Sequence, residues 1–243
     1  MTNPWGNLPY HPPYILPDEQ EKIKLFNDKV SKEDGIIEKQ LPGPYLGNPK
    51  KARVVILSLN PGYNNDDTKL HEEEPDFYKP LRKNLSHEDI PYPFYYLNPI
   101  WKDRNCGGYK YWYPLLNDII EEIAKNKSKD DAIRLVARRV SVIEWFPYHS
   151  KTFYKNIRFY KKILSELKSQ QYSIDLAKEA LKDKQKLIVV QRAYSLWEHK
   201  LGSLSETNVI THKSGRPPIN WYLKRKNLLD NDFDRICNKI MAS

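Results

Sequence analysis

The stretch that decides the fold is RVVILSLNPGYN, Arg53 to Asn64. After Arg53, four residues in succession are β-branched or apolar, which is typical of a buried strand. The run stops on Asn60-Pro61-Gly62, and these residue types favour a tight turn. Because open α/β sheets bind their ligands beyond the carboxyl ends of the strands, Asn60 is a candidate site residue.

Similar apolar runs alternate with amphipathic segments along the rest of the chain. Further strands are expected in RRVSVIEWFPYHS (138–150), KLIVVQ (186–191) and NVITHKSG (208–215). Apolar residues at helical spacing predict helices in YWYPLLNDIIEEIAKN (111–126), KNIRFYKKILSELKS (155–169), IDLAKEALKDK (174–184) and AYSLWEHKL (193–201). This alternation predicts an α/β fold, a three-layer α/β/α sandwich with a central four-stranded parallel sheet.

The chain has 243 residues and is 40 % hydrophobic, enough for a single domain whose core needs no disulfide or metal. Residues 1–50 are predicted to be a Pro-rich arm packed on the core. The arm contains one short helix in DEQEKIKLFNDKVSKEDG (18–35) and closes in the turn-rich LPGPYLGNPKK (41–51). Residues 51–243 are expected to form the main domain, with a long polar and aromatic insert over 63–108.

The chain is basic and rich in aromatic residues. Forty Lys and Arg against 31 Asp and Glu give a net charge of +9, with 17 Tyr and 6 Trp. Such a surface is typical of proteins that bind nucleic acid, although solvated lysines would give the same composition. Cys106 and Cys237 are too few for a disulfide framework or a thiolate cluster. No signal-like or membrane-spanning stretch is present, so we expect a cytoplasmic protein without membrane contact, metal, other cofactor or obligatory protein partner.

Three of the predicted strands end in unusual polar turns, at Asn60, Glu144 and His212. In a parallel sheet these ends meet at one edge, which makes them a candidate site. Each alone also has a plain structural explanation: a turn residue, a solvated acid and a surface histidine.

The same segments resemble motifs of the uracil-DNA glycosylase superfamily. SLNPG (58–62) is similar to the GxNPG motif of the mismatch-specific and single-strand-selective branches, with Ser in place of the first Gly. HKSGRPP (212–218) is similar to the closing motif HPSPRNP, and EWFP (144–147) has the layout of a middle strand that ends in Asn, with Glu instead. The resemblance runs from about Pro44 to the C-terminus.

This resemblance implies a DNA glycosylase that flips a base out of DNA and hydrolyses its N-glycosidic bond, leaving an abasic site. Asn60 would orient the attacking water and His212 would donate a hydrogen bond to the departing base. Ser214 would bind a phosphate and Arg216 would lie on a loop that enters the minor groove. Lys213 stands where the family has Pro, on this DNA-binding loop.

The departures from the family point to the substrate. Gly62 stands where the uracil-specific branch has a Tyr that walls off position 5 of the pyrimidine, so a 5-substituted base could enter. Glu144 as a carboxylate only accepts hydrogen bonds, which suits the amine of cytosine and not O4 of uracil. We therefore expect a bulky 5-substituted cytosine, such as the glucosylated hydroxymethylcytosine of phage DNA, and a role in antiviral defence like that of a phage-defence glycosylase in this superfamily. Tyr63 and Phe146 are candidates to contact the base.

Most rings of the aromatic cluster YPFYYLNPIW (92–101) are expected to pack the insert, and the basic stretches 151–162 and 222–227 are expected to contact DNA. Other functions remain open: a uracil-DNA glycosylase of base-excision repair, a glycosylase with lyase activity through a lysine, and a DNA-binding module without catalysis. A small-molecule α/β hydrolase is disfavoured because the chain has no GxSxG motif.

Overall fold

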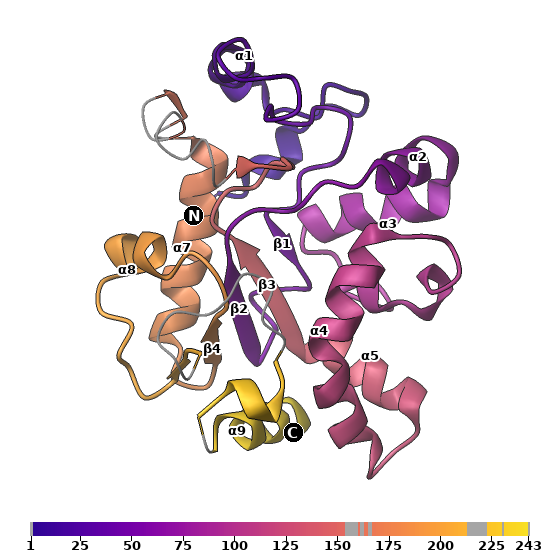
Figure 1. Ribbon diagram of the computed structural model, residues 1–243, viewed down its shortest axis with the longest axis vertical. Coiled ribbons are helices and arrows are strands. Elements are labelled where there is room, and N and C mark those ends of the chain that lie inside the picture. The colour runs from indigo at the N-terminus through magenta and orange to yellow at the C-terminus, as the bar shows by residue number, and fades with distance from the viewer. Residues whose placement is uncertain are drawn as a thin grey trace.

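The computed structural model describes residues 2–153, 160, 163–164, 167–212, 223–229 and 231–242. Its centre is a five-stranded mixed sheet in the order β1-β3-β2-β4-β5 (Figure 1). The strands are β1 (Tyr45–Leu46), β2 (Val54–Ser58), β3 (Val140–Glu144), β4 (Leu187–Val190) and β5 (Val209–Ile210). The pairs β3–β2, β2–β4 and β4–β5 are parallel, whereas β1 is antiparallel to β3.

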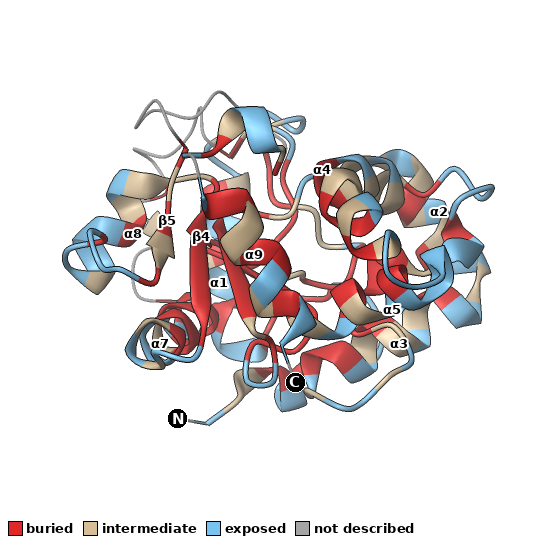
Figure 2. Ribbon diagram, turned by 90° about the horizontal axis from the view of Figure 1, so that it is seen from below, coloured by how far each residue is buried: buried red, intermediate tan, exposed pale blue. Residues whose placement is uncertain are grey.

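Helices lie on either side of this sheet, α7 and α8 on one side and α2 to α5 on the other (Figures 1 and 2). The α-helices are α1 (Gln20–Asn27), α2 (Asn65–Glu73), α3 (Pro75–Leu85), α4 (Gly107–Ala124), α5 (Lys129–Arg139), α7 (Lys168–Lys182), α8 (Tyr194–Leu201) and α9 (Asp232–Met241). Short 3₁₀ helices are η1 (Pro4–Asn7), η2 (Pro17–Glu19), η3 (Tyr95–Leu97), η4 (Pro99–Trp101) and η6 (Arg225–Asn227). None of the helices in the described ranges has the length and apolar content that a bilayer crossing requires.

The prediction of a mixed α/β chain is confirmed, but the sheet has one strand more than the sequence predicted. The turn-rich stretch 41–51 predicts no strand, but Tyr45–Leu46 within it pairs with β3. The backbone N–H of Glu144 donates to Pro44 O (2.8 Å) and so extends this pairing. This strand has only two residues, between Pro44 and Gly47, and the φ of Gly47 is +78°. Two residues are too few to show the alternation of apolar and polar residues that predicts a strand.

The insert over 63–108 contains helices that the sequence analysis missed. Helix α3 begins with Pro75 in its first turn and buries Phe77, Leu81 and Leu85, which are four residues apart on one face. Helices α5 and α9 were also missed, and α4 and α7 begin before the predicted ranges. Most of the helix expected over 155–169 lies outside the described residues.

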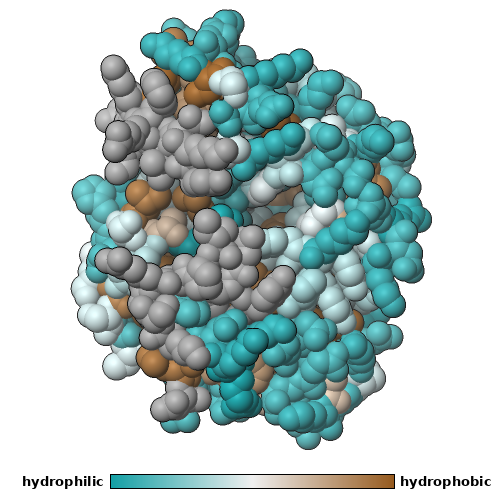
Figure 3. Space-filling model, in the orientation of Figure 1, coloured by the Kyte–Doolittle hydropathy of each residue, from teal (hydrophilic) through white to brown (hydrophobic). Residues whose placement is uncertain are grey.

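The core covers both the sheet and the N-terminal arm. Strands β2, β3 and β4 are buried along their whole length, and β4 is drawn in the red of buried residues in Figure 2. Trp5, Ile15 and Phe26 of the arm belong to the same buried cluster. The face in view in Figure 3 is mostly hydrophilic, with hydrophobic residues in small separate groups.

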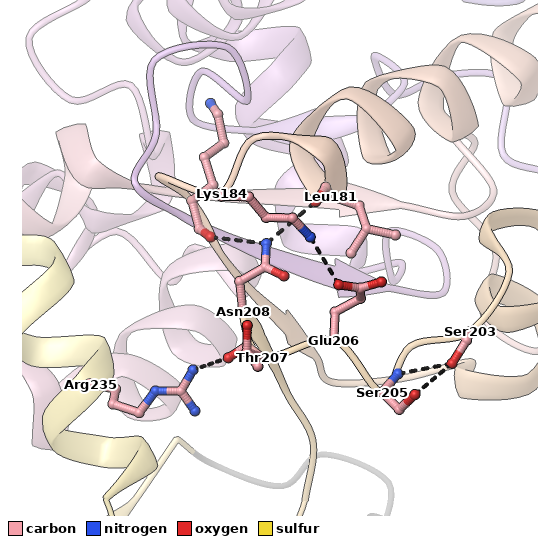
Figure 4. A network of polar contacts seen from close by, with 9 residues as sticks. Leu181, Lys184, Ser203, Ser205, Glu206, Thr207, Asn208 and Arg235 are labelled. Carbon is pink, nitrogen blue, oxygen red and sulfur yellow. Dashed lines mark hydrogen bonds and ion pairs between the residues drawn. The ribbon is translucent and has the colours of Figure 1, made fainter.

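The connection between α8 and β5 is held by side-chain contacts to its neighbours (Figure 4). The Asn208 amide donates to Lys186 O (3.3 Å), and the Arg235 guanidinium donates to Thr207 O. These contacts fix the start of β5 beside the start of β4, and β5 then runs parallel to β4 toward His212.

Candidate functional site

A cavity of about 240 Å³ lies at the carboxyl edge of the sheet. Strands β2 and β3 end side by side there, because Ser58 pairs with Glu144. The pairing continues past the strand ends, where Phe146 N–H donates to Leu59 O (2.8 Å), so the two turns stay together. The volume is just below the range of about 300–1,000 Å³ usual for small-molecule sites, which suits a ligand of about one ring.

Asn60 lies two residues beyond β2 and lines this cavity. Its side-chain amide donates to Pro61 O (2.9 Å) and Ser150 O (3.2 Å), and the residue is 8 % exposed. Both N–H bonds are thereby used, so the carbonyl Oδ1 is the group that Asn60 offers as an acceptor. An acceptor in this place can orient a water molecule but is too weak to deprotonate it.

Glu144 is the last residue of β3, is 3 % exposed and also lines the cavity. Burial raises the pKa of its carboxyl to about 7, against the lowering effect of a hydrogen bond from Ser58 and of the Arg192 charge. Among the described residues, Oε2 of Glu144 has no hydrogen-bond partner. An unsatisfied buried carboxylate oxygen costs about 1–3 kcal/mol. Because Glu144 also lines the cavity, this oxygen is available to a hydrogen-bond donor of a ligand.

Arg192 is a site residue that the sequence analysis missed. It follows β4, its N–H donates to Leu57 O (3.2 Å), and its side chain lines the cavity with its charge close enough to favour ionised Glu144. Ala193 beside it has a φ of +57°, which turns the chain sharply into α8. The signal was available, because Arg192 is the polar residue just after the predicted strand 186–191.

Gly62 and Tyr63 both line the cavity. No atom lies within 4 Å of the position that a Cβ on Gly62 would occupy, so there is open space beside it. The Tyr63 hydroxyl donates to Asn65, and the Lys151 ammonium lies 5.2 Å from the centre of the Tyr63 ring. Gly62 is itself exposed, so this open space lies where the cavity meets the surface.

His149 connects the Asn60 turn to the N-terminal arm. Its Nδ1 lies 2.5 Å from Gly62 O and its Nε2 lies 2.9 Å from Leu41 O. Burial lowers the pKa of this imidazole, and the contacts with the two carbonyls oppose that effect. The ring lines the cavity and holds the backbone of the turn against the arm, which is a structural role.

Phe146 and His212 do not line the cavity in the described part of the chain. Phe146 is fully buried and stacks on Phe153, with ring centres 4.6 Å apart. His212 lies two residues beyond β5 and is 8 % exposed. The predicted DNA-binding residues Lys213, Ser214 and Arg216 lie outside the described residues.

Besides Tyr63, aromatic residues line the cavity from three elements, and the first is Tyr45 of β1. Tyr96 comes from η3 and lies flat against Gly108, where a Cβ would be 2.4 Å from the ring. Tyr111 and Trp112 come from α4, and the sequence analysis did not single them out. Other rings of the insert are buried away from the cavity, as the packing explanation expected: Phe77, Phe94 and Tyr95.

The first turn of α4 is held against α2 by Asp67. Its carboxylate accepts from Gly107 N–H (2.7 Å) and Gly108 N–H (3.2 Å), and burial raises its pKa. This contact fixes the wall of the cavity that carries Tyr111 and Trp112. The described residues contain no cluster of His, Cys, Asp and Glu that could hold a metal ion.

Comparisons with known protein families, with curated proteins and with solved structures find no match for this chain.

Proposed function

We propose that the protein is a DNA glycosylase built on a three-layer α/β/α sandwich like that of the uracil-DNA glycosylase superfamily. The proposal rests mainly on one observation. Two buried polar side chains, Asn60 and Glu144, each present an oxygen to one base-sized cavity at the carboxyl edge of the sheet. Such an edge is where α/β folds bind ligands.

Cleavage of an N-glycosidic bond breaks C1′–N1 and sends the electron pair out with the base, while positive charge develops on the sugar. Oδ1 of Asn60 would accept a hydrogen bond from the water that attacks C1′, and the proton of that water passes to solvent. His212 would donate a hydrogen bond to the base oxygen that gains charge. Arg192 at the cavity adds a positive charge that favours the anionic leaving group.

The base would be a 5-substituted cytosine. Its exocyclic amine donates to Oε2 of Glu144, and its 5-position faces the open space at Gly62. With ionised Glu144, uracil would place O4 against an acceptor, which is a repulsive contact. Ser214 and Arg216 would bind the DNA backbone, and the net charge of +9 supports DNA as the partner. Such an enzyme would act in the cytoplasm, without a cofactor, against phage DNA that carries modified cytosine.

One observation favours a second substrate. With a pKa of about 7, Glu144 is partly protonated at neutral pH. A protonated carboxyl can donate to O4 of uracil, so uracil excision in base-excision repair is the alternative function.

The test is abasic-site formation, read as alkali-induced strand breaks, on matched DNAs with uracil, cytosine or 5-substituted cytosines. Breaks only at 5-substituted cytosines support the main proposal, and breaks only at uracil support the repair alternative. Asn60→Ala should abolish the breaks and controls for contaminating enzymes. Binding without breaks on any DNA would indicate a module that lacks catalysis, and borohydride trapping of a protein–DNA adduct would reveal lyase chemistry.

A further inference from the structure

The cavity extends beyond the reading position at Glu144, back along the sheet. Its lining includes Leu46 of β1 and Leu81 and Leu85 of α3. Leu46 pairs with Val142, two residues before Glu144, so Leu46 and Glu144 face the same side of the sheet. Leu81 and Leu85 are four residues apart and so lie on one face of α3. We call the part of the cavity lined by Leu46, Leu81 and Leu85 its far end.

The donors near the far end are already used within the protein. The Tyr45 hydroxyl donates to Leu85 O (2.6 Å). Both N–H bonds of the Asn84 amide are used as well, by Gly47 O (3.1 Å) and Pro93 O (3.2 Å). What this end offers to a ligand is therefore mainly the apolar surface of three leucines.

We propose that the far end binds the 5-substituent of the flipped base, and that this substituent is a short apolar chain and not a sugar. The inference rests on the proposed function, which places the 5-position at Gly62. A hexose carries several hydroxyl groups, and burying them beside leucines, where the neighbouring donors of Tyr45 and Asn84 are already used, is unfavourable. The pyrimidine ring and its substituent would share a cavity of about 240 Å³.

This arrangement explains how unmodified cytosine would be refused. Each methylene that fills an apolar pocket changes kcat/KM by about 10–200-fold. Cytosine itself leaves the far end empty, whereas a chain of two or three carbon atoms fills it. Excision should therefore become faster with each added carbon until the far end is full.

The experiment measures single-turnover excision from one oligonucleotide sequence that carries cytosine, 5-methyl-, 5-ethyl-, 5-propynyl-, 5-hydroxymethyl- or glucosylated 5-hydroxymethylcytosine. We expect 5-ethyl- or 5-propynylcytosine to exceed cytosine by at least about 100-fold, with the glucosylated base among the slowest. Faster excision of the glucosylated base than of the alkylated bases would overturn the inference and leave the glycosylase function in place.

The same set of oligonucleotides is then bound to the Asn60→Ala protein. A binding preference for the alkylated bases without any excision by the unaltered protein would sink the glycosylase proposal but support the assignment of the far end. If the Asn60→Ala protein shows no binding preference and the unaltered protein shows no excision, both the glycosylase proposal and the assignment of the far end are overturned.

A substitution in the wall tests the location. Leu81→Phe should shorten the far end and lower the ratio of 5-propynyl- to 5-methylcytosine excision by at least about 10-fold. Leu25→Phe, at a residue 46 % exposed on α1, is the matched control and should keep the ratio. Because the readout is a ratio, a general loss of folded protein does not imitate the effect, and an unchanged ratio in Leu81→Phe would contradict the assignment.

Discussion

Two buried glutamates, Glu19 and Glu144, differ in how completely their carboxyl groups are hydrogen-bonded. Glu19 is 1 % exposed, and its carboxylate accepts from the Tyr148 hydroxyl (2.5 Å) and from the backbone N–H and hydroxyl of Ser169 (both 2.8 Å). Glu144 is 3 % exposed and is left with Oε2 unsatisfied among the described residues. The satisfied carboxylate of Glu19 joins the N-terminal arm to α7, whereas the unsatisfied oxygen of Glu144 lies at the cavity, where we propose that a ligand binds.

Lys186, a buried lysine at the amino end of the strands, is fully hydrogen-bonded within the protein, as Glu19 is. The Lys186 ammonium donates to Pro49 O (2.8 Å), Lys50 O (2.8 Å) and Ala52 O (3.0 Å), just before β2 and β4 begin. Burial lowers its pKa, and its three donors are all used. The buried charge of Lys186 at the amino end of β2 and β4 is thus fully hydrogen-bonded, whereas the incompletely bonded carboxyl group of Glu144 lies at the carboxyl end.

The largest expected effect is a loss of excision rate when Asn60 in the site is replaced, compared with a residue outside the site. Asn60→Ala removes the acceptor that would hold the attacking water, and we expect the single-turnover excision rate to fall by at least about 100-fold with little change in DNA affinity. Asn126→Ala, at an exposed position after α4, is the control and should keep the full rate. Equal rates in the two variants would remove Asn60 from the mechanism.

The second prediction compares the two glutamates directly. The pKa of Glu144 is about 7 in the folded protein against an ordinary 4.5, so the folded state holds its proton more tightly than the unfolded chain. The free energy of unfolding should therefore fall as pH rises from about 4.5 to 7, by on the order of 3 kcal/mol. Glu144→Gln should remove this loss and stabilise the protein at pH 8, whereas Glu19→Gln should destabilise it by about 1–3 kcal/mol.

Urea unfolding of both variants at pH 5 and pH 8 measures these changes. The comparison fails if Glu144→Gln is destabilising at pH 8 by as much as Glu19→Gln. That result would mean that Glu144 is held by contacts as complete as those of Glu19.

The third prediction uses pH to change the base that Glu144 reads. Below pH about 7 the carboxyl becomes protonated and can donate to O4 of uracil. The ratio of uracil to 5-substituted cytosine excision follows the protonated fraction of Glu144, so it should rise about 5-fold between pH 8 and 7, about 2-fold more between pH 7 and 6, and level off below pH 6. In Glu144→Gln the ratio should be high and independent of pH, and a pH dependence retained in that variant would assign the effect to another group.

The sequence revealed the parts of the fold and the site that depend on local pattern. The strands at 54–58, 140–144 and 187–190 are short runs rich in Val, Ile and Leu. Asn60 lies two residues after the first and Glu144 ends the second, so their meeting in space follows from a parallel sheet. The site parts that escaped prediction depend on long-range contacts. Tyr111 and Trp112 reach the cavity only because Asp67 holds the start of α4, and Leu46 reaches it through a strand of two residues.

The smallest expected effect tests the open space beside Gly62. A Cβ there meets no atom within 4 Å and the backbone is not in the left-handed region, so Gly62→Ala should change the free energy of unfolding by no more than about 1 kcal/mol, toward greater stability. The added methyl group would lie where the 5-substituent passes, so excision of 5-substituted cytosines should slow by about 10-fold relative to uracil at pH 6. Thermal unfolding and the excision ratio measure the two effects separately. If the ratio does not change while the variant remains folded, the substituent takes another path, and Glu144 alone would then distinguish the bases.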